Sequence, residues 1–283
     1  MHTHPASATD RTPSKPFLKW PGSKRRLLLQ LHPLLPASRR LIEPFVGAGS
    51  VFLAADYDAY VINDANPDLV AMWAALQARP RKYISRAAEL FCETNHSREA
   101  YIDIRAQFNS EMDAFERAVL LPYLNRFGFN GLWRVNSSGQ FNVPYGQSKV
   151  VPKFPWDAME AASRKLHRCL VLNGGYRGAI DLAGEGDVVY CDPPYVDDAV
   201  PSFTQYTSTR FGMSEQQELV RACECAVDRG ATVLISNHDT PTTRELYAGW
   251  HIETVCVRRS IAATADARGL ARELVACLSP GCA

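Results

Sequence analysis

The segment DVVYCDPPY (187–195) decides the fold. It is an apolar, β-branched run that ends in an acid, two prolines and an aromatic residue. Such a run is typical of a strand buried on both faces of a sheet, and proline ends it because it cannot donate to a strand ladder. Ligands of open α/β sheets bind beyond the carboxyl ends of the strands. We therefore expect a ligand at the turn formed by Asp192, Pro193, Pro194 and Tyr195.

Six further runs of this kind occur along the chain. They are RLIEPF (40–45), AYVIND (59–64), CLVLNGG (169–175), TVLISN (232–237), HIETVCV (251–257) and ELVACL (273–278). Several are followed by turn residues and alternate with helical stretches, which predicts a mostly parallel α/β sheet of seven strands. The last two are joined without clear helical periodicity. We expect them to form a hairpin, with one antiparallel strand at the end of the sheet.

The alternation breaks between residues 65 and 164, where helical patterns dominate. Within it, residues 125–146 (NRFGFNGLWRVNSSGQFNVPYG) predict an irregular loop or small hairpin. We expect one α/β domain built from residues 17–64 and 165–283, interrupted by a mainly helical insert at 65–164. The first 16 residues are polar and rich in Pro, Ser and Thr, and we expect a disordered tail there.

Composition narrows the class of protein. The formal net charge of +1 predicts no partner by itself, but residues 117–153 contain no acid and can present a basic face to a polyanion. The eight cysteines form no C-x-x-C pair and several lie in apolar runs, which favours reduced, buried thiols in a cytoplasmic protein over a disulfide framework or a zinc site. No run approaches the ~18 apolar residues of a membrane span.

A second candidate site is EPFVGAGS (43–50), between a strand and a helical run. Gly47 and Gly49 let a ligand approach the backbone, although a G-x-G often marks only a tight turn. The third glycine of the dinucleotide fingerprint is missing, which disfavours a nicotinamide-dependent oxidoreductase. Asp64 ends the next strand and suits the two hydroxyls of a ribose, while Lys24 suits a carboxylate. Both groups occur in S-adenosylmethionine.

The turn at 192–195 suits an exocyclic amine. Its prolines leave neighbouring carbonyls as outward acceptors. If Asp192 and the Pro193 carbonyl accept the two amine hydrogens, the nitrogen moves toward sp³ and its lone pair is aimed at an electrophilic methyl group. Tyr195 can stack on the base. Any exocyclic amine meets these demands, so adenine N6 and cytosine N4 are both acceptable acceptors.

Seven blocks carry a wider resemblance. They are FLKWPGSK (17–24), EPFVGAGSVF (43–52), LNRFGFNGLWR (124–134), FNVPYG (141–146), VVYCDPPY (188–195), LISNHDTPTTRE (234–245) and VRRSI (257–261). In this order the chain resembles the Dam-type DNA adenine-N6 methyltransferases, EC 2.1.1.72. The resemblance implies a Rossmann-like methyltransferase fold with an inserted DNA-recognition domain. It also implies S-adenosylmethionine as methyl donor, no metal, and a cytoplasmic monomer acting on GATC in double-stranded DNA.

The resemblance also assigns roles. The implied cofactor contacts are Trp20, Lys24, Phe45, Gly47, Gly49, Asp64 and Asp192. Lys19 matches a reader of the first guanine, and Arg134 matches a reader of the guanine opposite the final cytosine, for which its fork is suited. The other implied DNA contacts are Leu132 and Pro144 at the thymine, Phe129 inserted into the base stack, and Asn130 near the orphan base. Ordinary core packing is the alternative for Phe129 and Leu132.

The chain departs from the family pattern at several positions. Gln147 and Ser148 stand where the best-known member has an arginine on a phosphate and a tyrosine near the target. Pro21 and Ser23 replace small residues, and residues 262–271 are less basic than their counterpart. Fewer phosphate contacts weaken binding and its salt dependence. A non-catalytic DNA-binding regulator is the alternative from another class, against which the intact DPPY turn argues.

Overall fold

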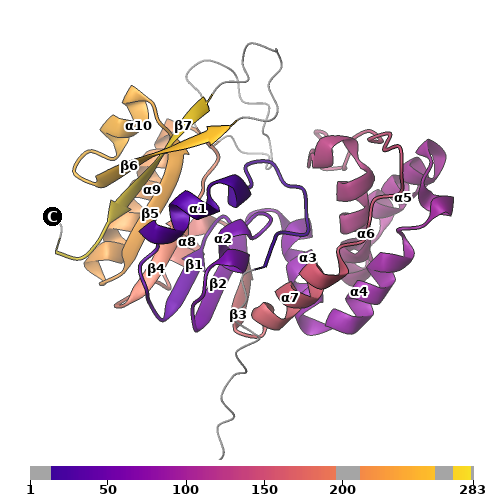
Figure 1. Ribbon diagram of the computed structural model, residues 1–283, viewed down its shortest axis with the longest axis horizontal. Coiled ribbons are helices and arrows are strands. Elements are labelled where there is room, and N and C mark those ends of the chain that lie inside the picture. Colours follow the sequence, from indigo (N-terminus) through magenta and orange to yellow (C-terminus); the bar gives the residue numbers. More distant parts are fainter. Residues whose placement is uncertain (1–13, 196–210, 259–269, 282–283) are drawn as a thin grey trace, which may run out of the picture.

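A computed structural model describes residues 14–195, 211–258 and 270–281. Its centre is a seven-stranded sheet in the order β3-β2-β1-β4-β5-β7-β6 (Figure 1). The strands are β1 (Arg40–Glu43), β2 (Ala59–Asp64), β3 (Cys169–Asn173), β4 (Asp187–Cys191), β5 (Thr232–His238), β6 (His251–Arg258) and β7 (Leu270–Leu278). All seven predicted strands are confirmed, and the mixed α/β sheet is the one expected of a Rossmann-like methyltransferase.

The predicted hairpin forms between β6 and β7, but its place in the sheet differs from the expectation. β7 is antiparallel to both β5 and β6 and lies between them, so the antiparallel strand is not at the end of the sheet. Leu274 and Ala276 on β7 are fully buried, whereas His251 and Glu253 on β6 are exposed. The apolar strand therefore occupies the interior and the polar strand forms the edge.

Helices cover both faces of the sheet. They are α1 (Leu28–Leu31), α2 (Ser50–Ala54), α3 (Pro67–Ala78), α4 (Pro80–Glu89), α5 (Arg98–Ser110), α6 (Ala114–Phe127), α7 (Trp156–Leu166), α8 (Tyr176–Ile180), α9 (Met213–Asp228) and α10 (Pro241–Leu246). Successive residues of a strand point to opposite faces of the sheet. Leu41 packs in the core on the side of α1 to α7, and Ile42 packs in the core on the side of α8 to α10. Strands buried on both faces explain the continuous apolar runs of the sequence.

The chain between β2 and β3 forms α3 to α7, and α4 to α6 lie beside the β3 end of the sheet (Figure 1). In the described part of this stretch, two isolated bridges, Gly128 with Tyr145 and Val135 with Phe141, form the small hairpin. The core continues from the sheet into these helices: Trp73 of α3 packs edge-on against Phe52 of α2, with ring centroids 6.0 Å apart. The domain boundaries at 64/65 and 164/165 stay predictions.

The sheet order places a topological switch point between β1 and β4. From β1 the chain proceeds through β2 and β3 on one side, and from β4 through β5 on the other. Switch points are where open α/β sheets bind ligands. The two segments singled out in the sequence, 43–50 and 192–195, follow these two strands directly.

Parts of three expectations lie outside the described residues: residues 1–13 of the tail, the end of the VRRSI block, and most of residues 262–271. Ser14 of the tail is described, and its amide donates to the Leu53 carbonyl. Among the described cysteines, Cys191 and Cys223 are buried, but Cys225 and Cys256 are exposed. Across the described ranges, no helix combines the length and the apolar character that a bilayer crossing demands.

Candidate active site and nucleic-acid interface

The turn after β1 depends on glycine at two positions. Gly47 and Gly49 have φ of +50° and +69°, a region that side chains disfavour. A Cβ at Gly47 would lie 3.2 Å from the Trp20 ring, and one at Gly49 would lie 3.2 Å from the Trp73 ring. Glycine at these two positions therefore lets the backbone of the turn pack directly against the Trp20 and Trp73 rings.

Asp64, at the end of β2, is joined to this turn. One of its carboxylate oxygens accepts the Gly47 amide at 3.0 Å, and the other accepts the Asn66 amide at 2.9 Å. Burial raises the pKa of Asp64, and the backbone donors oppose that shift. A carboxylate oxygen can accept more than one hydrogen bond, so both oxygens keep capacity for a diol.

Aromatic rings flank the turn on two sides. Trp20 stacks on Trp133, with ring centroids 5.6 Å apart. Phe45 stacks on Tyr176 at 5.5 Å and meets Phe211 edge-on at 5.9 Å. Tyr176 begins α8, after β3, and Phe211 precedes α9. Neither residue was predicted from the sequence. The turn thus has aromatic surface on which a purine can stack.

Asp192 carries two partners on one oxygen. Its Oδ1 accepts the Ser236 hydroxyl at 2.9 Å and forms an ion pair with Lys24 Nζ at 2.7 Å. The Tyr190 hydroxyl in turn donates to Ser236 at 3.1 Å. The Lys24 side chain is only 5% exposed, and its ammonium lies 4.6 Å from the centroid of the Tyr195 ring. Lys24 therefore lies at the DPPY turn, where its ammonium pairs with the carboxylate of Asp192.

Tyr195 is anchored by the antiparallel part of the sheet. Its hydroxyl donates to Glu273 Oε2 on β7 at 2.9 Å, and its ring meets the His238 ring edge-on at 4.6 Å. Burial, together with the nearby carboxylates of Asp192 and Glu273, raises the pKa of Tyr195, so the phenol stays protonated and donates. Glu273 was not predicted as a site residue, although an acid at the start of the apolar run ELVACL (273–278) indicates a special role.

The two DPPY carbonyls differ in their surroundings. Gln216 of α9, fully buried, donates to the Pro194 carbonyl at 2.9 Å. Asn237 of β5 donates to the side-chain oxygen of Gln216 and to the Tyr247 hydroxyl, the latter at 3.0 Å. Within the described residues, no donor is found on the Pro193 carbonyl.

Glu43, the last residue of β1, lies buried behind this site at 3% exposure. Burial raises the pKa of Glu43 well above its usual range, and the negative charge of Asp192 raises it further. One of its oxygens has no hydrogen-bond partner among the described atoms. A protonated Glu43 adds no second negative charge beneath Asp192.

The six predicted DNA contacts, Lys19, Phe129, Asn130, Leu132, Arg134 and Pro144, are all exposed, and we call them the recognition face. Phe129 is 47% exposed and Leu132 is 38% exposed. Ordinary core packing, the alternative for these two residues, is therefore wrong. Apolar side chains held in solvent beside an exposed Arg134 form a surface suited to a partner.

Buried backbone clamps hold this face together. The fully buried Asn125 accepts the Lys19 amide at 2.8 Å and donates to the carbonyls of Lys19 and Gly131. Gly131, with φ of +67°, packs so closely that a Cβ there would lie 2.3 Å from Lys19 Cβ. The Phe129 amide donates to the Pro144 carbonyl at 2.9 Å. The structure thus brings Lys19 beside residues more than 100 positions away.

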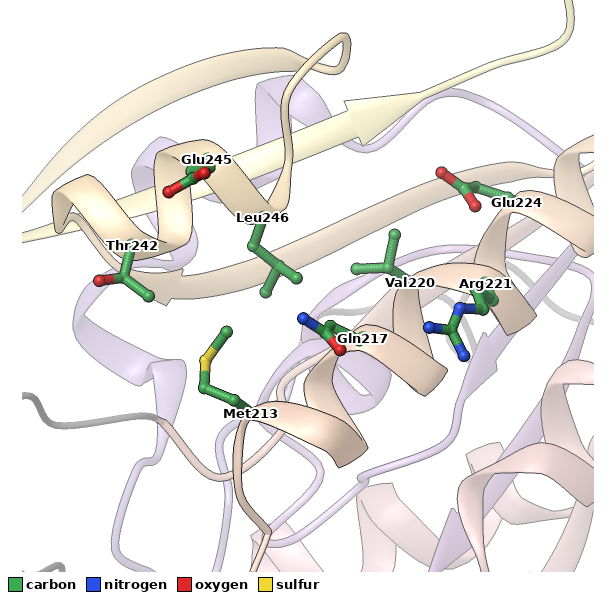
Figure 2. A pocket seen from close by; sticks show the side chains of 8 residues that line it. All are labelled: Met213, Gln217, Val220, Arg221, Glu224, Thr242, Glu245 and Leu246. Carbon is green, nitrogen blue, oxygen red and sulfur yellow. The ribbon is translucent and has the colours of Figure 1, made fainter.

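One hollow lies away from both sites. It has a volume of about 470 Å³ and opens between α9 and α10 (Figure 2). Its lining residues are Met213, Gln217, Val220, Arg221, Glu224, Thr242, Glu245 and Leu246. None of them belongs to the DPPY turn, the glycine turn or the recognition face, so the hollow is no part of the candidate active site.

Comparison with known proteins agrees with this geometry. The model of the D12 class N6 adenine-specific DNA methyltransferase family matches residues 20–261. A DNA adenine methylase of Vibrio cholerae is 42% identical over 266 residues, which cover 93% of this chain and 96% of the relative. A DNA adenine methylase of Escherichia coli K12 is 41% identical over 269 residues, with coverage of 95% and 96%.

A phage protein extends the set. The DNA N-6-adenine-methyltransferase of Escherichia phage P1 is 40% identical over 280 residues, which cover 97% of this chain and 36% of the phage protein. The family match decides between the two amines that the DPPY turn left open, in favour of adenine N6 over cytosine N4. The chain belongs to the D12 class of N6 adenine-specific DNA methyltransferases.

Proposed function

We propose that this adenine-specific DNA methyltransferase acts on an adenine flipped out of a GATC site in double-stranded DNA, with S-adenosylmethionine as methyl donor. One observation carries the proposal. At the switch point of the sheet, the DPPY turn follows β4, and the glycine turn, whose Gly47 amide is bonded to Asp64, follows the neighbouring strand β1. An acceptor amine and a donor can therefore meet there.

The residues of the glycine turn fit the donor. Asp64 keeps acceptor capacity for the ribose diol, and the Gly47 turn, closed by Trp20, leaves no room for a side chain. Phe45 offers a stacking surface for the adenine of the donor. Lys24 is the proposed partner of the donor carboxylate. When bound, the donor supplies an electrophilic methyl carbon on a sulfonium.

The DPPY turn orients the acceptor. Asp192 and the Pro193 carbonyl accept the two N6 hydrogens, Pro194 shapes the turn, and Tyr195 stacks on the base. The N6 lone pair would attack the methyl carbon that the donor supplies, with the sulfur as leaving group, and one N6 proton would pass to Asp192 along its hydrogen bond. No covalent enzyme intermediate and no metal are needed. Positioning supplies much of the rate because it makes the step effectively unimolecular.

The recognition face reads the duplex. Lys19 and Arg134 contact guanines, Leu132 and Pro144 contact the thymine, and the exposed ring of Phe129 enters the stack left open by the flipped base, next to Asn130. Flipping is required because the target atom is out of reach inside a duplex. A monomer suffices, since one chain carries both sites.

The test uses purified protein, labelled donor and short duplexes. We expect label on N6 of adenine in a GATC duplex, and none when hypoxanthine, which lacks the amine, replaces the target adenine. Label on both duplexes would contradict the amine acceptor. Tight GATC binding without any transfer would favour the regulator over the enzyme. Asp192→Asn is the matched variant: we expect it to bind duplex and donor but to transfer little label.

A further inference from the structure

The Lys24 ammonium occupies the place that the mechanism gives to the acceptor amine. It lies 2.7 Å from Asp192 Oδ1, the carboxylate that should accept an N6 hydrogen. It also lies 4.6 Å from the centroid of the Tyr195 ring, on which the base should stack. The Gly22 carbonyl accepts a third bond from it at 3.1 Å. An entering base would therefore compete with the ammonium for Asp192 Oδ1 and for the Tyr195 ring.

A second carboxylate lies within reach of the same ammonium. Glu273 Oε2 on β7 is 3.9 Å from Lys24 Nζ, and its side chain is only 14% exposed. The same oxygen accepts the Tyr195 hydroxyl. Glu273 therefore lies beside both groups that the entering base meets: Lys24, which must move, and Tyr195, which stays in place.

We propose that Lys24 moves from Asp192 to Glu273 when the target adenine enters, and that Glu273 is the positioning residue that receives it. The proposal rests on the roles proposed above for Asp192 and Tyr195. A lysine held between two carboxylates needs no new buried counter-ion, since the charge that leaves Asp192 is taken up by Glu273. Leaving a buried ammonium unpaired would instead carry a large penalty.

The chemistry of the acceptor gives the shift a purpose. N6 gains positive charge as the methyl group arrives, and the face of an aromatic ring stabilises a cation. The surroundings of the Lys24 ammonium, Asp192 and the Tyr195 ring, are thus suited to a cationic nitrogen. Once Lys24 has moved, the negative charge of Asp192 is available to the N6 cation.

Two other roles for Glu273 predict different results. It could serve only as the hydrogen-bond acceptor that fixes the Tyr195 ring. Alternatively, Lys24 could bind only the donor carboxylate, its partner in the proposed function, without any contact to Glu273, although its three donors allow both contacts. The isosteric change Glu273→Gln separates these roles, because the amide oxygen still accepts the Tyr195 hydroxyl but carries no negative charge.

The experiment measures single-turnover methylation of a GATC duplex, donor affinity by titration, and base exit by fluorescence of 2-aminopurine at the target position. For Glu273→Gln we expect a transfer rate lower by about tenfold or more, as for loss of a partly buried charge pair, with donor affinity changed less than about twofold. Base exit should weaken in parallel. In a Lys24→Met background, the same change should leave base exit within about twofold.

Several results would overturn the proposal. A transfer rate of Glu273→Gln close to the parent would make Glu273 a holder of Tyr195 only. Donor affinity falling in step with the rate would show that Glu273 acts through donor binding and does not receive Lys24 from Asp192. Additive effects on base exit in the double variant would remove the link between the two residues. Thermal unfolding of each variant excludes misfolding. Unimpaired transfer by Asp192→Asn would instead contradict the proposed function itself.

Discussion

The DPPY turn and the recognition face hold their side chains in opposite ways. At the turn, the chemical groups themselves are partly buried and bonded: Asp192 to Ser236 and Lys24, Tyr195 to Glu273. On the recognition face, the six side chains stand in solvent, and what is buried is the backbone clamp formed by Asn125.

This difference indicates where the protein can change. Altering one member of a buried polar network leaves its partner unsatisfied, at a cost of about 1–3 kcal/mol or more. An exposed side chain can be replaced without that penalty. Two of the departures from the family pattern, Gln147 and Ser148, are exposed. We infer that the reaction is constrained by the fold, while sequence preference is adjustable.

The largest effect should come from the turn. Asp192→Asn replaces an acceptor by a donor and should lower the transfer rate about a hundredfold to a thousandfold, in the range of losing one strong group aimed at the reacting atoms. Duplex affinity should stay near the parent value, because Asp192 is no part of the recognition face. Single-turnover rates and filter binding measure the two quantities. An equal loss of both would show that the regions are not separate.

The clamp should come next. Gly131→Ala places a Cβ 2.3 Å from Lys19 Cβ and should displace Lys19, with a loss of about a hundredfold in transfer to GATC, as an ångström-scale misplacement produces. Gly139→Ala is the matched control, since its φ of +75° imposes similar strain but no atom lies within 4 Å of the new Cβ. Equal activity of both variants would contradict the clamp.

A smaller effect is expected at one base contact. Arg134→Ala should reduce discrimination at the last base pair of GATC by about 1–3 kcal/mol, the worth of a bidentate arginine–guanine contact. Transfer rates on duplexes altered at that pair, compared with duplexes altered at the first pair, give the measurement. Equal relaxation at both pairs would show that Arg134 has a general rather than a base-specific role.

The smallest effect belongs to a departure position. Gln147→Arg should add one phosphate contact and steepen the plot of log affinity against log salt by about one. Because Gln147 already has φ of +52°, the substitution adds no new backbone strain. Ser148→Tyr should leave the slope unchanged. A slope for Gln147→Arg equal to that of the parent would place this loop away from the backbone of the duplex.

The sequence predicted what local pattern encodes. Seven apolar runs predicted seven strands, and the strand ends located Asp64 and Asp192. It did not predict that β7 lies between β5 and β6, because strand order depends on which hairpin strand is the more apolar across the whole sheet.

The missed site residues share one cause. Ser236, Gln216 and Glu273 reach the DPPY turn from β5, α9 and β7, which only the fold brings together. Glu273 left a signal, an acid in an apolar strand, whereas Gln216 on a polar helix left none. The sequence also did not decide whether Phe129 and Leu132 are exposed, because an aromatic residue and a leucine occur as often in a hydrophobic core; the structure shows both exposed.

The central claim is that the hydrogen-bonded DPPY turn determines the reaction and the exposed recognition face determines the target sequence. Sequencing of plasmid DNA from an unmethylated host that expresses this protein tests both parts together, because it reports the modified base and its context. The account predicts N6-methyladenine, confined to GATC. N4-methylcytosine, or N6-methyladenine in no fixed context, would contradict it.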